Sequence, residues 1–126
     1  MSLSAYKKTI KNTEQPRDIE RRILSQVTSD LEAVKASIDD IDASERKSAI
    51  TPDVRKALWD NQKLWITVKA DLMAPENQLA PSLKADLISL AHWIDKQTSE
   101  ILKGEGTVEP LIEVNRNIIN GLSGRA

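Results

Sequence analysis

The sequence predicts an all-α protein, a compact bundle of about four helices whose first helix is long. Apolar residues recur at intervals of three and four along four segments, and no segment alternates with a period of two. The 4 glycines and 5 prolines stand mainly between these segments or at their ends, where they interrupt helices. At 126 residues the chain is about one domain long, so we expect a single helical domain over residues 1–126, with residues 1–14 and 123–126 frayed.

The first helix is expected over residues 16–43. Pro16 suits the first turn of a helix, where the N–H that proline lacks would have no partner. The apolar stripe of this helix consists of Ile23 or Leu24, Val27, Leu31, Val34, Ile38 and Ile41. Asp39 and Asp40, followed by the polar residues 44–48, predict a solvated helix end and then a loop.

The second helix has a clear beginning and end. Thr51 is a good N-cap, Pro52 suits the first position, and Asp53 complements the positive end of the helix dipole. Pro75 ends the helix. Its main stripe is Val54, Leu58, Asn61, Trp65, Val68 and Leu72, and a second set of apolar residues, Trp59, Leu64, Ile66 and Met73, lies outside that stripe. We therefore expect this helix to be central and to contact more than one neighbour.

The third helix is expected from Pro81 to Gly104, since glycine is the usual residue just beyond a helix end. Its stripe consists of Leu83, Leu87, Leu90 or Ala91, Ile94 and Ile101. The fourth helix is expected over residues 108–122, with Thr107 as its cap and Pro110 in its first turn. Leu111, Val114, Ile118 and Leu122 form its apolar face.

The residues that catalysis requires are scarce. The chain has no cysteine, which excludes disulfides, thiolate metal sites and cysteine nucleophiles. Its single histidine, His92, belongs to no metal-binding motif, and we interpret it as a structural or surface residue. Gly104 and Gly106 form no phosphate-binding loop, because no Gly-Lys-Ser/Thr follows them. We expect no catalytic residues, no metal, no cofactor and no small-molecule substrate.

The charge and hydropathy of the chain favour a cytoplasmic protein. The net charge of −1 provides no overall attraction to nucleic acid, and the one basic cluster, within the first 22 residues, is more typical of a solvated helix start, so direct nucleic-acid binding is disfavoured. No stretch approaches the roughly 18 apolar residues of a membrane helix, and lysines interrupt the N-terminal region where a signal peptide would have its apolar core. We expect no membrane association.

Three stretches, residues 58–65, 71–90 and 109–122, resemble the FlaF family of flagellar biosynthesis regulators. They include the Trp–Asn–Trp arrangement of the second helix, and Tyr6 and Pro16-Arg17 extend the resemblance toward the start of the chain. The resemblance implies a cytoplasmic regulator of flagellum biogenesis that binds flagellin, promotes its synthesis and secretion, and acts together with FlbT. The alternative is an RNA-binding or FlbT-binding post-transcriptional regulator of flagellin expression.

Four residues are candidates for partner binding: Trp59, Trp93, Asn115 and Arg116. For the two tryptophans, packing against a neighbouring helix and anchoring of a partner both remain open, since Trp is enriched in binding hot spots. Asn115 either bonds to Asn61 as a bridge between the second and fourth helices or, with Arg116, binds a partner's backbone. Trp65 lies on the main stripe and is expected in the core. We expect the partner, an amphipathic helix, to lie in a groove beside the second and third helices.

Overall fold

The computed structural model describes residues 16–122, with side chains described between Arg21 and Gly121. The α-helices are α2 (Pro16–Asp39), α3 (Pro52–Met73), α4 (Pro81–Leu102) and α5 (Glu109–Leu122), and the 3₁₀ turns η1 (Ala43–Glu45) and η2 (Lys47–Ala49) connect α2 to α3. No strand occurs between residues 16 and 122. The predicted all-α bundle of four helices with a long first helix is therefore confirmed. The predicted frayed ends and Tyr6 lie outside the described residues.

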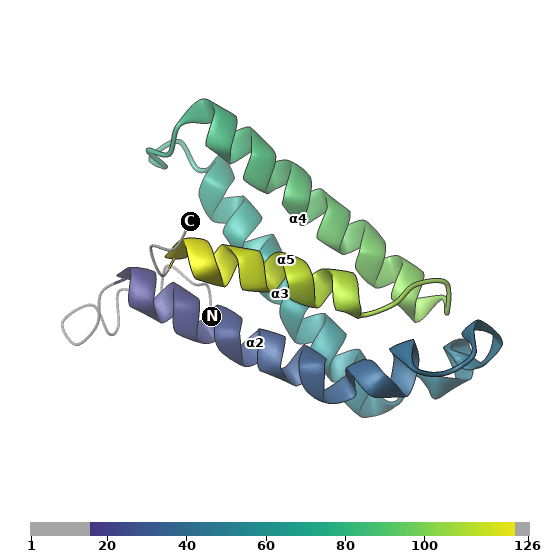
Figure 1. Cartoon of the computed structure of the whole chain (residues 1–126). Coiled ribbons are helices and arrows are strands. Elements are labelled where there is room, and N and C mark those ends of the chain that lie inside the picture. Colours follow the sequence, from purple (N-terminus) through teal and green to yellow (C-terminus); the bar gives the residue numbers. More distant parts are fainter. Residues whose placement is uncertain (1–15, 123–126) are drawn as a thin grey trace.

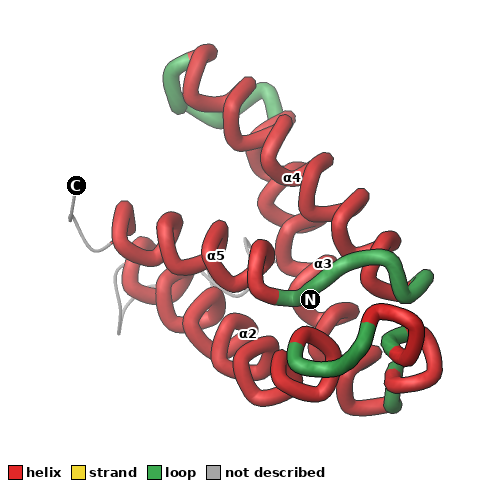
Figure 2. The backbone as a smooth tube through the Cα atoms, turned by 45° about the vertical axis from the view of Figure 1, so that its right-hand side comes forward, coloured by secondary structure: helices red, strands yellow, loops and turns green. Residues whose placement is uncertain are grey.

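The helices form two antiparallel pairs that diverge from each other. α5 runs back along α2, and α4 runs back along α3, which crosses the α2–α5 pair (Figure 1). α3 and α4 extend beyond the rest of the bundle, and the loop between them lies at the tip of this extension (Figure 2). The 3₁₀ turns and the α4–α5 connection lie together at the opposite end of the α3–α4 hairpin.

Polar side chains fix the register of the α2–α5 pair. Asp39, the last residue of α2, accepts hydrogen bonds from the backbone N–H groups of Val108 (2.7 Å) and Glu109 (2.9 Å) at the start of α5. Toward the other end of the pair, Arg116 donates from Nε and Nη2 to one carboxylate oxygen of Glu32, at 3.2 and 2.8 Å. Two predictions are thus wrong: Asp39 is half-buried rather than solvated, and its carboxylate supplies the capping hydrogen bonds that were expected from Thr107.

α2 ends earlier than the periodicity predicted, at Asp39 rather than at residue 43. The cause is a side-chain cap, because Arg46 donates from Nε to the carbonyl oxygen of Ile38 at 2.9 Å and so satisfies one of the free carbonyls of the last helical turn. Residues 44–48, predicted to be a loop, form the two 3₁₀ turns that bring Arg46 back to this position.

The predicted ends of α3 and α4 are confirmed. Thr51 Oγ1 accepts the N–H of Val54 at 3.2 Å, and Pro52 begins α3. Beyond α4, Gly104 has a φ of 81° and donates its N–H to Ile101 O, while the N–H of Glu105 reaches Glu100 O, both at 2.9 Å. These two bonds define a Schellman motif, which requires the left-handed conformation that glycine adopts without strain.

The core lies where α3 crosses the α2–α5 pair and meets the second half of α4. Its most completely buried side chains include Leu31, Ile38, Leu58, Trp65, Ile94, Ile101, Leu111 and Ile112. Trp65 is buried as predicted and donates from Nε1 to Asn115 Oδ1 at 3.0 Å, and Asn115 Nδ2 donates to Asn61 Oδ1 at 2.8 Å. The predicted asparagine bridge between α3 and α5 is therefore confirmed. As expected for a central helix, α3 packs against α2 and α4, and it is hydrogen-bonded to α5 through this bridge.

The core does not continue to the tip of the α3–α4 hairpin. Leu83, which was predicted to lie on the core stripe of α4, is 45% exposed, and Leu79 in the preceding loop is exposed as well. The reason is the divergence of the two helix pairs, since α2 and α5 do not extend to the tip (Figure 1).

Candidate protein-binding surface

Three large apolar side chains form an exposed stripe along α3. Trp59, Ile66 and Met73 are 59%, 57% and 64% exposed. They are seven residues apart, and positions at that interval drift by only about 20° around a helix, so the three point to the same side of α3. We call these three residues the α3 stripe. The excess of apolar residues on this helix was visible in the sequence, but these three contact solvent instead of a further helix.

A groove between α3 and α4 adjoins the α3 stripe. It has a volume of about 120 Å³ and is lined by Gln62, Trp65, Ile66 and Lys69 of α3 and by Ala91, His92, Ile94 and Asp95 of α4. Polar contacts bridge it, because Gln62 donates from Nε2 to Asp95 Oδ1, and Lys69 Nζ lies 3.5 Å from His92 Nδ1. A small groove is thus present between the second and third predicted helices, and Ile66 of the α3 stripe is among its lining residues.

Trp59 and Trp93 lie on different surfaces. Ala91 and Asp95 of α4 line the groove toward α3, and Trp93 stands two residues from each, about 200° around the helix. Trp93, 37% exposed, therefore points away from α3, whereas Trp59 lies on the same side of α3 as Ile66. A single partner helix in the α3–α4 groove would contact Trp59 but not Trp93.

The two polar candidates on α5 have different environments. Asn115 is fully buried, and both atoms of its amide are engaged by Trp65 and Asn61, so its side chain is not available to a partner in this conformation. Arg116 is exposed, but its guanidinium is bonded to Glu32. A partner that used Arg116 would have to compete with this ion pair.

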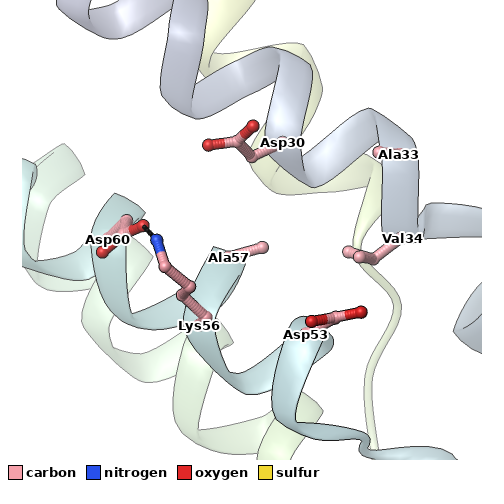
Figure 3. Close-up of a pocket in the computed structure, with 7 residues that line it drawn as sticks. All are labelled: Asp30, Ala33, Val34, Asp53, Lys56, Ala57 and Asp60. Atoms are coloured by element: carbon pink, nitrogen blue, oxygen red, sulfur yellow. Dashed lines mark hydrogen bonds and ion pairs between the residues drawn. The ribbon is translucent and has the colours of Figure 1, made fainter.

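A second groove lies between α2 and α3, and three of its seven lining residues are aspartates. It has a volume of about 330 Å³, with Asp30, Ala33 and Val34 on the α2 side and Asp53, Lys56, Ala57 and Asp60 on the α3 side (Figure 3). Lys56 donates to Asp60 Oδ2 at 2.7 Å. This hydrogen bond raises the pKa of Lys56, and the negative charges of Asp60 and Asp30 act in the same direction.

Between residues 16 and 122 there is no group of three or more histidine, cysteine, aspartate or glutamate side chains that could hold a metal ion. None of the described helices combines the length and the hydropathy that crossing a membrane requires. The features that distinguish the surface are its exposed apolar side chains.

The described residues form four α-helices, with large apolar side chains exposed on the α3–α4 hairpin. The chain matches the family model of the flagellar protein FlaF over residues 2–122, nearly its whole length, and it belongs to the FlaF family. No curated protein and no solved structure is detectably similar to the chain. The protein is therefore a flagellar protein.

Proposed function

We propose that the protein regulates flagellum biogenesis by binding flagellin in the cytoplasm and by promoting its synthesis and secretion together with FlbT. Membership of the FlaF family supports a flagellar role. The observation that carries the binding function is the α3 stripe, where Trp59, Ile66 and Met73 are each more than half exposed. Such side chains are typical of a surface that a partner covers.

The geometry of the hairpin suits a helical partner. The α3 stripe presents an apolar side chain after every two turns of the helix, and its middle residue, Ile66, lines the groove between α3 and α4. A bound helix would therefore have apolar side chains on one side and a depression on the other. Unassembled subunits that form helical contacts in a filament must keep those segments covered before export. A binder of this kind covers them in the cytoplasm and releases them when the subunit is exported.

The experiment that tests this function compares three partners. The purified full chain is mixed separately with flagellin, with FlbT and with the leader of the flagellin mRNA, and each binding isotherm is measured at low and high salt. The proposal predicts a flagellin complex at micromolar concentrations. FlbT binding without flagellin binding would replace it with a purely regulatory role, and RNA binding that falls steeply with added salt would favour an RNA-binding regulator.

A further inference from the structure

We propose that α3 and α4 bind an amphipathic helix whose apolar stripe is flanked by acidic side chains. The proposal rests on the proposed binding function and deepens it, since it names the chemistry of the segment that is bound. The surface consists of the α3 stripe together with Ile88 and His92 of α4, and we call it the outer face. His92 lines the α3–α4 groove, and Ile88, four residues earlier, lies on the same side of α4.

The spacing within the outer face fits a helix better than an extended strand. Trp59 and Met73 are 14 residues apart, which corresponds to about 21 Å along the helix axis. A repeat of seven residues keeps two packed helices in contact along their length, because the side chains of each return to the shared seam after every two turns. A partner helix with the same repeat can contact all three residues of the stripe.

The charges on α3 are segregated between two sides of the helix. Its carboxylates are Asp53, Asp60 and Asp71, and the first two line the groove toward α2, away from the stripe. Asp71, eleven residues after Asp60, lies at nearly the same angle around the helix. The acidic side of α3 therefore faces α2, and the outer face contains none of the three carboxylates.

Basic residues flank the stripe on both sides. Arg55 and Lys63 each stand four residues from Trp59, and Lys69 stands three after Ile66 and four before Met73, so each is a surface neighbour of the stripe. Within residues 16–122, none of the three forms an ion pair with a carboxylate. Asp95 of α4, which lines the groove, accepts a hydrogen bond from Gln62. The outer face is thus apolar along its middle and cationic at its edges, in a chain whose net charge is −1.

This charge pattern selects the partner. A helix with glutamate or aspartate beside its apolar stripe would place negative charge against Arg55, Lys63 and Lys69, which favours encounter and fixes orientation. A helix with basic flanks would place like charges against each other. The same repulsion opposes a symmetric dimer through this face, since the two copies would bring identical basic edges together.

The test uses two synthetic peptides and the full-length protein. Both peptides are alanine-based helices with one identical leucine stripe, and they carry either glutamate or lysine at the positions beside that stripe. Binding is measured by titration calorimetry, and circular dichroism checks that every variant keeps its helical content. We expect the glutamate peptide to bind at least about tenfold more tightly than the lysine peptide, with a preference that weakens as salt is added.

Two variants and a control locate the binding. Ile66→Glu should weaken binding of the glutamate peptide by about tenfold or more, since it places a charge in the centre of the stripe. The double variant Lys63→Glu/Lys69→Glu should reverse the preference between the two peptides. Glu113→Lys changes an exposed residue of α5, away from the outer face, and should leave both affinities unchanged.

Equal binding of the two peptides, no binding of either, or an unchanged preference in the double variant would overturn the proposal. A dimer of the free chain that dissociates in the Ile66→Glu variant would also overturn it, because the stripe would then be a self-association surface. The outcome is separable from that of the proposed function. If the chain prefers the glutamate peptide but does not bind flagellin, flagellin is excluded as the partner and the docking surface stands. If flagellin binds and Ile66→Glu does not weaken that binding, flagellin stands as the partner and the outer face is excluded as the docking surface.

Discussion

The carboxylate of Asp39 caps a helix that begins 70 residues later, and its Oδ1 accepts the N–H of Val108, the residue just before that helix, at 2.7 Å. Its Oδ2 accepts the N–H of Glu109 at 2.9 Å. The end of α2 is therefore bonded directly to the start of α5. Because the bonds join two elements that are distant in sequence, they stabilise the antiparallel pairing of α2 and α5 as well as the α5 terminus.

Asp39→Ala should destabilise the protein by about 1 kcal/mol. Removal of a helix cap costs about 0.5–2 kcal/mol, and part of that loss is offset because an aspartate at the end of α2 interacts unfavourably with the dipole of its own helix. Urea unfolding monitored by circular dichroism measures the change. Asp40→Ala, at the exposed neighbouring position, is the matched control and should change stability by less than about 0.5 kcal/mol. Equal effects of the two substitutions would contradict the capping role.

The sequence predicted the helix ends whose chemistry is local. Thr51 and Pro52 at the start of α3, Pro81 at the start of α4 and Gly104 beyond its end each act on groups within a few residues, so their roles can be inferred without the fold. The role of Asp39 cannot be inferred in that way, because its partners come from another helix. Aspartates at the end of a helix are usually solvated, which is why the sequence predicts a solvated side chain for Asp39.

The candidate surface was predicted in part. The apolar periodicity placed Trp65 on the main stripe of α3 and Trp59 outside it. Trp65 is buried and Trp59 is exposed, since the two lie on different sides of the helix. The periodicity did not indicate that Trp93 points away from α3, because the direction of a side chain relative to another helix depends on how the two helices pack. The regular spacing of Trp59, Ile66 and Met73 was present in the sequence, but the exposure of these side chains depends on which sides of α3 the other helices cover.

Gly104→Ala should destabilise the protein by more than about 1–2 kcal/mol, the cost of the left-handed conformation for a residue with a Cβ. The new Cβ would also lie 2.8 Å from Lys47 Cβ and 2.9 Å from Lys47 N, so the contact between η2 and the end of α4 would have to shift. Thermal unfolding followed by circular dichroism measures the effect.

Gly121→Ala is the matched control, because nothing lies within 4 Å of the Cβ it adds and the position is helical. It should stabilise the protein by up to about 0.5–1 kcal/mol, since alanine loses less backbone entropy than glycine in a helix. The account of Gly104 would fail if both substitutions shifted the melting temperature in the same direction by similar amounts.

The asparagine bridge should behave as a coupled pair. Asn115→Leu removes the acceptor of Trp65 Nε1 and leaves Asn61 without its bond, and each buried polar group left unpaired costs about 1–3 kcal/mol. Asn61→Leu leaves Asn115 Nδ2 unpaired. The double variant loses both amides, so its destabilisation should be smaller than the sum of the two single values by about 1 kcal/mol.

Chemical unfolding of the wild type, the two single variants and the double variant measures this coupling. Asn61 Nδ2 has no hydrogen-bond partner among the described residues, so Asn61→Leu should be the milder of the two single substitutions. Additive effects would show that the two amides act independently and would exclude the bridge as a shared element of stability.

The exposed and buried tryptophans of α3 should respond oppositely to a charge. Trp59→Glu should change the free energy of unfolding by less than about 0.5 kcal/mol, because the side chain is mostly exposed. Trp65→Glu places a carboxylate in the core and should cost more than about 4 kcal/mol or prevent folding. Denaturant unfolding of both variants decides this, and a large loss of stability in Trp59→Glu would place Trp59 in a packed environment.

Hydrogen exchange of the full chain with and without flagellin tests most directly whether the α3–α4 hairpin is the binding surface. Mass spectrometry of peptides from α2, α3, α4 and α5 reports where amide exchange slows on binding. The account predicts slower exchange in residues 59–73 of α3 and in the part of α4 that contains Ile88 and His92. Slower exchange confined to α2 and α5, with the hairpin unchanged, would contradict it.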